Sequence, residues 1–525
     1  MSVRWLPVAA ALVYGVVLLR RLPEIVGQLT WNADYVSQMA IAQSAGTAGK
    51  PARAVIIQIG YFWFDLLTFP LPFHQFVWDY APAAMALAAL LLIAWTSWRL
   101  AGRFAAALSV SIGLAASPLV LATQVAQAYH GSTWFGMALL AAYLCWLLTT
   151  RRGRTTVIAV SAIVAVVAGI ATASDPLLGP AGDGPFAAAL LFMWWRERIA
   201  RSKAVAAAAT AVCLAGVAGM TVLGGRLAGF TSSFPRGLTH VVPPEHFIGN
   251  LRQLVGGVFE VAGMPHTGSA LGVVLGLVVL AADLLPLLWL IHSFRRPNPA
   301  PLTAVVAFWS ASALFVAGAF VFSDVPADFL ENSARYLVPM FYVMVAIVPL
   351  WVAADVRRAA VVAVPAAALI LANAWAVDQA ARARDFEPSF SFDLNAPIAF
   401  LEERGLTHGY AAFDEASPMS VKTDFRLHVY PVTQMFVGPG DDCGATPPRG
   451  ICPYAYNSAS DWYRGRSGPT FILIDPYMVR LSQPPLADLD SVSAVYQVGR
   501  FTIYEYPDDV ASHMGTPERF KRPLL

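Results

Sequence analysis

The chain carries about eleven hydrophobic stretches that are each long enough to cross a bilayer, which takes about 20 apolar residues per helix. They are residues 5–22, 80–98, 104–124, 133–150, 156–174, 176–195, 204–224, 269–292, 302–323, 336–354 and 359–377. Lipid offers no hydrogen bonds to a bare backbone, so stretches of this length predict transmembrane α-helices. The composition, 57% hydrophobic and 13% charged, is too apolar for an ordinary soluble protein. We therefore predict a polytopic α-helical membrane protein.

Basic residues fall in every second short loop between these stretches. They are Arg99 and Arg103; Arg151, Arg152 and Arg154; Arg196, Arg198, Arg201 and Lys203; Arg295 and Arg296; and Arg357 and Arg358. Cytoplasmic loops carry an excess of Lys and Arg, so we expect these loops and the N-terminus to be cytoplasmic. Arg20 and Arg21, just beyond the first span, depart from this pattern. The abundance of Ala, Val, Gly and Arg with few Lys is typical of a high-GC bacterium.

The spans divide the chain into a transmembrane part, residues 1–378, and a C-terminal part, residues 379–525, which we expect to be extracytoplasmic. Two large outer loops, residues 23–79 and 225–268, interrupt the transmembrane part. In the second loop, apolar residues recur on one helical face from Phe247 to Phe259, which predicts an amphipathic helix at the membrane surface.

The C-terminal part is more polar and has no stretch of span length. A capping signal at Asp393 predicts a helix there. Short apolar runs predict strands at Tyr410–Phe413, Leu427–Val432 and Phe471–Ile474, and a hairpin around Gly499. We therefore predict a small α/β domain, without the glycine-rich loop of a nucleotide site. Cys443 and Cys452 flank a short loop in this part, and in an oxidising compartment we expect them to form a disulfide.

Asp34 lies at the outer end of the first span, where it opens a polar helical stretch. An enzyme that takes sugars from a polyprenyl-phosphate carrier needs a carboxylate at the membrane surface to deprotonate the acceptor hydroxyl. Asp34 meets this need. Asp is also favoured as a helix cap, and the sequence leaves both roles open.

Two further residues are expected at the same membrane depth. Asp175 ends the fifth span immediately before Pro176, where an acid is costly unless it is solvated or paired. His130 lies on the second outer turn, at the same membrane depth. Each could instead be an ordinary turn residue. Together with Asp34, these side chains could hold a divalent cation, although nothing in the sequence requires one.

Arg335 begins a late span on its outer side, beside Tyr336. The guanidinium group presents a planar fork that matches phosphate oxygens, so Arg335 is the best candidate to bind a carrier phosphate. The alternative is an interfacial arginine that extends towards the head groups. Glu245 and His246, in the loop at 225–268, are candidates for lining the same site.

The whole layout resembles the GT-C class of polytopic membrane glycosyltransferases, which use polyprenyl-phosphate sugars. The resemblance implies that Asp34 is the catalytic base, that Asp175 assists it, and that Arg335 with Tyr336 contacts the donor phosphate. Many members of the class carry two adjacent acids in the first outer loop. Here the corresponding residues are Ala33-Asp34-Tyr35, with a single acid.

The resemblance implies an inverting hexosyl- or pentosyltransferase of the cell membrane, with an extracytoplasmic glycan, lipid or protein as acceptor. The alternative is a non-catalytic membrane protein that transports lipid-linked glycans or assembles the envelope through an exterior interaction domain. A transporter usually has ionisable residues in mid-span, whereas the candidate acids Asp34 and Asp175 lie at span ends, which favours the enzyme. A net charge of +2 without a basic tract argues against a nucleic-acid partner.

Overall fold

The computed structural model describes residues 3–29, 33–48, 54–56, 59–126, 128–232, 241–264, 270–295, 298–325, 333–383, 393–434, 451–454, 457–475 and 491–514. The chain divides into two compact units. The helical unit comprises residues 1–28, 79–221 and 237–386, and the sheet unit comprises residues 29–78, 222–236 and 387–525. The sheet unit therefore takes in the first outer loop and part of the second as well as the C-terminal part.

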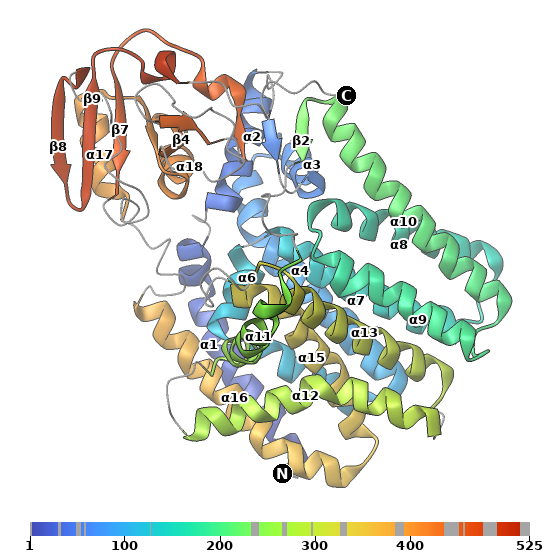
Figure 1. Ribbon diagram of the computed structural model, residues 1–525. Helices are drawn as coiled ribbons and strands as arrows, with labels where there is room; N and C mark the ends of the chain where they lie inside the picture. The colour runs from blue at the N-terminus through green and yellow to red at the C-terminus, as the bar shows by residue number, and fades with distance from the viewer. Residues whose placement is uncertain are drawn as a thin grey trace. The chain divides into compact units, whose positions relative to one another are not determined.

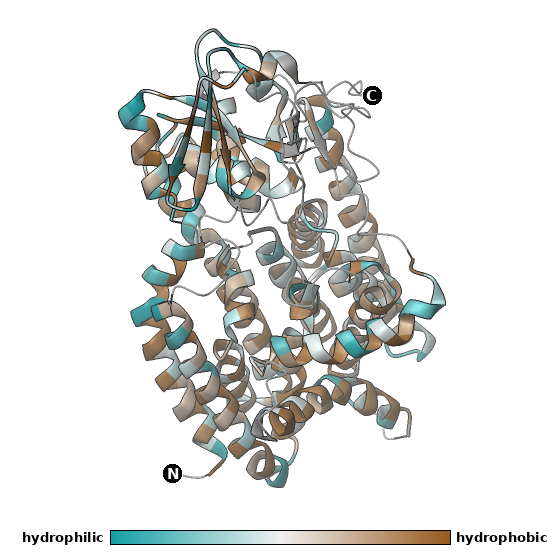
Figure 2. Ribbon diagram, turned by 60° about the vertical axis from the view of Figure 1, so that its left-hand side comes forward, coloured by the Kyte–Doolittle hydropathy of each residue, from teal (hydrophilic) through white to brown (hydrophobic). Residues whose placement is uncertain are grey.

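Nine of the described helices are long and apolar enough to cross a membrane. They are α1 (Leu6–Leu29), α4 (His74–Ala101), α7 (Ala128–Thr149), α8 (Arg154–Ser174), α10 (Arg201–Leu227), α12 (Ala270–Arg295), α13 (Ala300–Phe322), α15 (Val338–Ala353) and α16 (Val356–Ala383). Figure 1 shows these long helices, and Figure 2 shows that hydrophobic residues predominate along them. This arrangement confirms the predicted polytopic α-helical fold.

The stretch expected at 104–124 is a bent pair of helices, α5 (Arg103–Leu114) and α6 (Pro118–Ala126), with an angle of 90° between them. The bend frees backbone carbonyls that lipid could not satisfy. Side chains from other helices satisfy them. Tyr14 donates its hydroxyl to the carbonyl of Ala116 at 2.8 Å, and Asn373 donates its amide to that of Ala115 at 2.9 Å.

The stretch expected at 176–195 is also broken. A π-helical turn, η2 (Gly179–Asp183), leads into α9 (Gly184–Trp195), which has 12 residues. Pro180 and Pro185 lie at the starts of these two segments, where a missing backbone N–H costs least. Ser312 of α13 donates its hydroxyl to the carbonyl of Ala181 at 2.8 Å, so this break too is stabilised by a neighbouring helix.

Burial differs strongly among the long helices. The most apolar part of the span that ends in α15 is 83% buried inside the protein, whereas that of α10 is 17% buried. Large apolar side chains such as Leu19 on α1 and Val212 on α10 are more than two-thirds exposed. Such surfaces would be unfavourable in water, and lipid solvates them.

The sheet unit contains two sheets. Three short strands, β1 (Ala54–Ile56), β2 (Phe230–Ser232) and β6 (Ser458–Ala459), pair in the order β2-β1-β6. Helices α2 (Ala33–Ala48) and α3 (Ile59–Thr68) flank β1 in the sequence. The larger sheet has the order β5-β4-β3-β7-β9-β8. Its strands are β3 (His408–Ala411), β4 (His428–Gln434), β5 (Ile451–Pro453), β7 (Thr470–Ile474), β8 (Ala494–Val498) and β9 (Phe501–Tyr506).

Strands β4, β3 and β7 of the larger sheet are parallel, and the outer pairings are antiparallel. Helices α17 (Asn395–Arg404) and α18 (Phe413–Lys422) form one hydrophobic core with these strands. The core includes Leu401 of α17, Met419 of α18 and Phe471 of β7. Figure 1 shows α17 beside β7, β9 and β8. The predicted hairpin around Gly499 is confirmed, and Gly499 has a φ of 60° that favours glycine.

Helices α2 and α18 pack side by side in the same direction within the sheet unit. Ser37 donates its hydroxyl to that of Ser417 at 2.8 Å, and Gln43 donates its amide to the carboxylate of Asp424 at 3.3 Å. These two contacts join residues that are 380 and 381 positions apart, so the helices run parallel. The C-terminal part therefore holds the helix that carries Asp34.

Glu415, in the first turn of α18, is fully buried, and neither of its carboxylate oxygens has a hydrogen-bond partner among the described residues. Burial, with help from the nearby carboxylates of Asp414 and Asp475, raises the pKa of Glu415 to about 8, and Arg500 partly opposes this. The folded-state pKa thus lies above the unfolded value of about 4.3. Stability from this group is complete at low pH and is lost as pH rises towards 8.

We expect Glu415→Gln to remove this pH dependence. Between pH 5 and pH 8, the wild type should lose up to about 1.4 kcal/mol of stability per pH unit through Glu415, and the variant should lose less. Thermal unfolding of the full chain across this pH range measures the difference. Glu403→Gln, an exposed change on α17, is the control. Parallel pH profiles for the wild type and Glu415→Gln would contradict the assignment.

Candidate functional site

A buried carboxylate lies at the C-terminal end of α8. Pro176 disfavours a helical conformation in Asp175, which is extended with φ −140° and ψ 110° and ends the helix. Asp175 is 3% exposed. Its Oδ1 accepts the backbone N–H of Leu177 at 3.0 Å, and its Oδ2 accepts the hydroxyl of Thr133 at 2.5 Å. These bonds offset the cost of burying a carboxylate.

His130 completes the group around this carboxylate. Its Nδ1 lies 2.8 Å from Oδ2 of Asp175, and the imidazole is 1% exposed. His130 and Thr133 are three residues apart on α7, so both side chains reach the same carboxylate from one helical face. A carboxylate bonded to Nδ1 fixes the orientation of the ring and leaves Nε2 as its chemically active nitrogen.

Tyr336 and Arg335 belong to the same group. They lie in η5 (Ala334–Leu337), a turn that leads into α15. The edge of the Tyr336 ring meets the His130 ring, with centroids 5.9 Å apart and planes at 85°. The Arg335 guanidinium lies 5.2 Å from the centre of the Tyr336 ring and donates to its hydroxyl at 3.4 Å. The structure therefore connects Asp175, His130, Tyr336 and Arg335, all of which were candidates from the sequence.

The aromatic residues next to His130 were not predicted from the sequence. The Trp134 ring lies 5.7 Å from the His130 ring and stacks on Tyr342 at 5.5 Å. Tyr342 accepts the amide of Gln124 at 2.9 Å. Trp134 is fully buried, and its indole N–H has no partner among the described residues, which is uncommon for a buried donor. Helical spacing could have found Thr133 and Trp134, which follow His130 by three and four residues.

The remaining candidates lie elsewhere in the chain. Asp34 is the second residue of α2 in the sheet unit, where a carboxylate is favoured by the helix dipole, and its side chain lies outside what the structure describes. Glu245 and His246, in the turn η3 (Pro244–His246), are both exposed.

Within the described residues, no group of three His, Cys, Asp or Glu side chains is arranged to hold a metal ion. Cys452 is disulfide-bonded, and its expected partner Cys443 lies outside the described residues.

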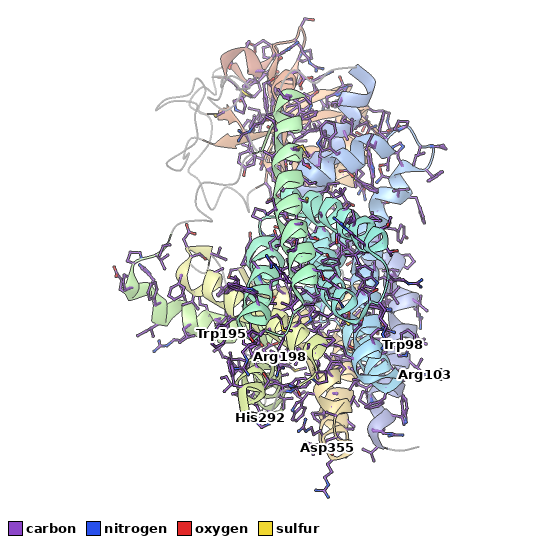
Figure 3. All side chains as sticks on the ribbon, turned by 90° about the vertical axis from the view of Figure 1, so that its right-hand side faces the viewer. Trp98, Arg103, Trp195, Arg198, His292 and Asp355 are labelled. Carbon is purple, nitrogen blue, oxygen red and sulfur yellow. The ribbon has the colours of Figure 1, made fainter. Side chains whose placement is uncertain are left out.

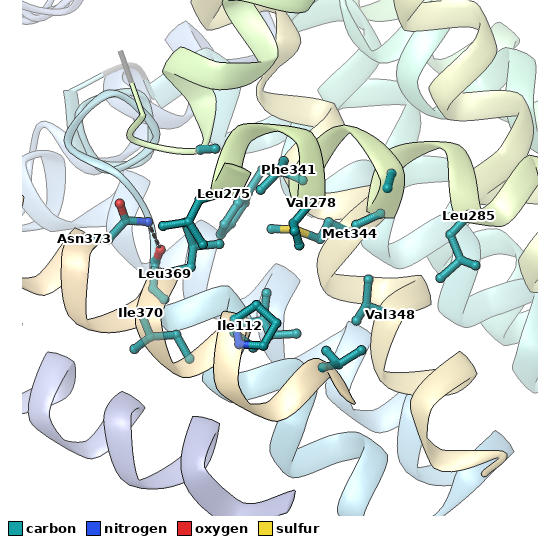
Figure 4. A pocket seen from close by; sticks show the side chains of 18 of the residues that line it. Ile112, Leu275, Val278, Leu285, Phe341, Met344, Val348, Leu369, Ile370 and Asn373 are labelled. Carbon is teal, nitrogen blue, oxygen red and sulfur yellow. Dashed lines mark hydrogen bonds between the residues drawn. The ribbon is translucent and has the colours of Figure 1, made fainter. Parts of the chain in front are cut away.

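An apolar cavity of about 370 Å³ lies within the helical unit (Figure 4). Its walls come from α5, α12, α15, α16 and the end of α11 (Phe247–Val261), the helix that the amphipathic pattern predicted. Leu275, Phe341 and Met344 line it, and Asn373 supplies an amide at one end. Two residues after the end of α11, Gly263 has a φ of +76° and leaves no room for a Cβ, since one would lie 2.2 Å from Asn373 Oδ1.

Comparison with solved structures finds the same fold in a bacterial membrane protein. The crystal structure of ArnT from Cupriavidus metallidurans in the apo state matches with a TM-score of 0.52 and 14% sequence identity. The match covers 95% of this chain and 98% of ArnT. The structure of the same protein bound to undecaprenyl phosphate matches with a TM-score of 0.50 and 12% identity, over 93% and 97% of the two chains. No protein-family model and no curated protein sequence matches the chain.

The short bond from Thr133 to Asp175 can be tested by Thr133→Val, which keeps the shape of the side chain and removes its donor. We expect a loss of stability of about 1 to 3 kcal/mol, because the buried carboxylate loses one of its partners. Thr149→Val is the matched control on the same helix, since the Thr149 hydroxyl bonds only carbonyls of its own helix, such as that of Cys145 at 2.8 Å. Equal thermal midpoints for the two variants would contradict this prediction.

Proposed function

We propose that this protein is an inverting glycosyltransferase that moves a sugar from a polyprenyl-phosphate carrier to an extracytoplasmic acceptor. The observation that carries the proposal is the likeness to ArnT, which extends over nearly the full length of both chains. One of the ArnT structures is bound to undecaprenyl phosphate, a polyprenyl carrier. The multi-pass helical fold and the apolar cavity support the proposal further.

The cavity offers a place for the hydrocarbon chain of the carrier. Apart from the Asn373 amide and the Met344 thioether, the side chains that line it are aliphatic or aromatic, or belong to proline. Such a lining suits a hydrocarbon chain, because the chain offers no partner for a buried polar group. The end of α11 forms part of the wall, which gives the amphipathic helix a role in enclosing the carrier.

In the proposed reaction, the Asp34 carboxylate takes the proton of the acceptor hydroxyl as that oxygen attacks C1 of the sugar. The bond between C1 and the acceptor oxygen forms while the bond between C1 and the phosphate oxygen breaks. The phosphate leaves with the bonding electrons, and the configuration at C1 inverts. Arg335 stabilises the negative charge that develops on the phosphate.

His130 and Asp175 have supporting roles in this proposal. Because three donors surround the Asp175 carboxylate and it is almost fully buried, Asp175 acts through His130, whose ring it orients. In this proposal, His130 and the Trp134 indole N–H contact the polar part of the donor. Tyr336 holds Arg335 by the contact between its ring and the guanidinium.

The proposed orientation places the N-terminus in the cytoplasm and the C-terminal part outside the cell, because the basic loops alternate along the chain. Figure 3 labels Arg103, Arg198 and Asp355, which come from three of these loops, and all three lie towards the lower part of that view. The Arg358 guanidinium lies 4.6 Å from the centre of the Trp351 ring, an arrangement suited to a membrane interface.

Asp34→Asn tests the catalytic base. Purified full-length protein is given a panel of polyprenyl-phosphate sugars, and release of free polyprenyl phosphate is followed with and without a chelator. We expect kcat to fall by about 100-fold or more, because removal of a general base costs that much. Asp393→Asn, an exposed change in the C-terminal part, should leave kcat unchanged. Turnover by Asp34→Asn at the wild-type rate would exclude Asp34 as the base.

Leu275→Trp tests the carrier site by filling the cavity. Leu275 is 5% exposed and lines the cavity on α12. We expect KM for a long-chain donor to rise by about tenfold or more, which corresponds to about 1.4 kcal/mol of lost binding. Val273→Trp, on an exposed position of the same helix, is the matched control. An unchanged KM in both variants would place the carrier elsewhere.

A further inference from the structure

One face of the large sheet carries polar and aromatic side chains that the proposed mechanism does not use. Strands β3 and β4 pair in parallel with His408 opposite His428 and Tyr410 opposite Tyr430. Alternate side chains of a strand point to opposite faces. Ala411, next to Tyr410, and Val429, between His428 and Tyr430, belong to the core formed with α17 and α18. The two histidines and two tyrosines therefore occupy the other face of the sheet.

The two imidazoles stack there, with centroids 4.7 Å apart and planes at 18°, and both are half-buried. Arg466 approaches them from the segment after η7 (Ser460–Tyr463). It donates through Nη1 to Nε2 of His408 at 2.6 Å and through Nη2 to the hydroxyl of Tyr430 at 3.3 Å. We call His408, His428 and Arg466 the basic cluster.

Among the described residues, no carboxylate forms a salt bridge with the basic cluster. The nearby carboxylate is that of Asp509, and other donors occupy it. Its Oδ1 accepts the hydroxyl of Tyr410 at 2.9 Å and its Oδ2 accepts the backbone N–H of Arg466 at 2.6 Å. By contrast, Arg426 and Arg500 of the same unit pair directly with Glu402 and Asp475. The exposed Arg466 guanidinium donates to a neutral ring instead of a carboxylate.

This environment disfavours positive charge on the imidazoles. Burial, then the neighbouring His428 and Arg466, lower the pKa of His408 to about 4, although Asp509 partly opposes them. Burial and Arg466 also lower the pKa of His428. Both rings are then neutral at neutral pH. An anion placed beside them would favour their protonation.

The aromatic residues near the basic cluster already face one another. Tyr430 stacks on Trp462 with centroids 5.3 Å apart and planes at 15°, and both are more than nine-tenths buried. Their ring faces are therefore occupied by each other, and an uncharged sugar ring would find no open aromatic platform there. The groups of the site that can bind a ligand are therefore its nitrogen donors.

We propose that His408, His428 and Arg466 bind an oxyanion, namely a phosphate, sulfate or carboxylate group on the extracytoplasmic glycan that accepts the sugar, and that binding is coupled to proton uptake by the imidazoles. The guanidinium has further N–H groups besides the two that contact His408 and Tyr430, and each protonated imidazole adds a charged donor. Protonation of His408 at Nε2 releases Arg466 towards the anion, because that nitrogen can then no longer accept its hydrogen bond. Anion binding itself is independent of the proposed function. The assignment of the anion to the acceptor rests on it.

Sulfate is the probe for the binding step, because its charge stays constant between pH 5.5 and 8. Full-length protein in detergent is titrated with sodium sulfate at constant ionic strength set by chloride. We expect saturable binding that tightens as pH falls, by up to about tenfold per pH unit for each proton taken up. Absence of saturable binding at pH 5.5, or an affinity that does not change with pH, would overturn the proposal.

Variants assign the binding to the basic cluster. Arg466→Gln should weaken sulfate binding by about tenfold or more, and His428→Asn should reduce its pH dependence. Arg426→Gln removes an arginine that is already paired with Glu402 and should bind sulfate like the wild type. Equal affinities in Arg466→Gln and Arg426→Gln would place the anion elsewhere.

Turnover separates the acceptor assignment from anion binding. Arg466→Gln should raise KM for the acceptor and leave KM for the polyprenyl-phosphate donor unchanged. If sulfate binds as expected but KM for the acceptor does not move, the anion does not belong to the acceptor. Failure of the transferase proposal itself would instead appear as absence of donor turnover in the wild type, with sulfate binding intact.

Discussion

The helical unit depends on satisfying polar groups that are buried among apolar helices, where each unpaired group costs several kcal/mol. Asp175 illustrates this constraint, because its carboxylate collects a backbone N–H, a threonine hydroxyl and an imidazole. The same carboxylate ends α8 and fixes His130 on α7. One buried acid therefore determines both the local path of the chain and the orientation of a candidate functional group.

Breaks in the helices obey the same constraint. The bend between α5 and α6 leaves carbonyls that Tyr14 and Asn373 satisfy, and Asn373 also stands at one end of the apolar cavity. Gly263 lies against Asn373 with no space for a side chain. The cavity that we assign to the carrier is thus built on hydrogen bonds that hold a broken helix in place.

Much of the fold could be predicted from the sequence, because transmembrane helices are marked by length and apolarity alone. Each of the expected stretches corresponds to a long helix or to a broken one, and the amphipathic pattern at Phe247–Phe259 corresponds to α11. The break at η2 was not predicted, since a π-helical turn leaves the hydrophobic pattern nearly intact. The helix α18 was not predicted either, and the strand expected at Tyr410–Phe413 ends at Ala411.

The candidate site was partly predictable for a related reason. Membrane depth, read from the spans, brought Asp175, His130, Tyr336 and Arg335 together as candidates, and the structure connects them. Local patterns cannot reveal pairings between distant segments. The β1 strand joins β2 and β6, which lie far along the chain, and the stacking of His408 on His428 depends on strand register. The burial of Glu415 could not be predicted either, because charged side chains ordinarily lie at the protein surface.

The most direct test of the central claim is to identify both products of the wild-type protein acting on polyprenyl-phosphate sugars. Mass spectrometry identifies the released carrier, and NMR gives the anomeric configuration of the transferred sugar. We expect free polyprenyl monophosphate in equal amount to the glycosylated acceptor, with the configuration at C1 inverted. Retention of configuration, or release of a carrier diphosphate, would contradict the account.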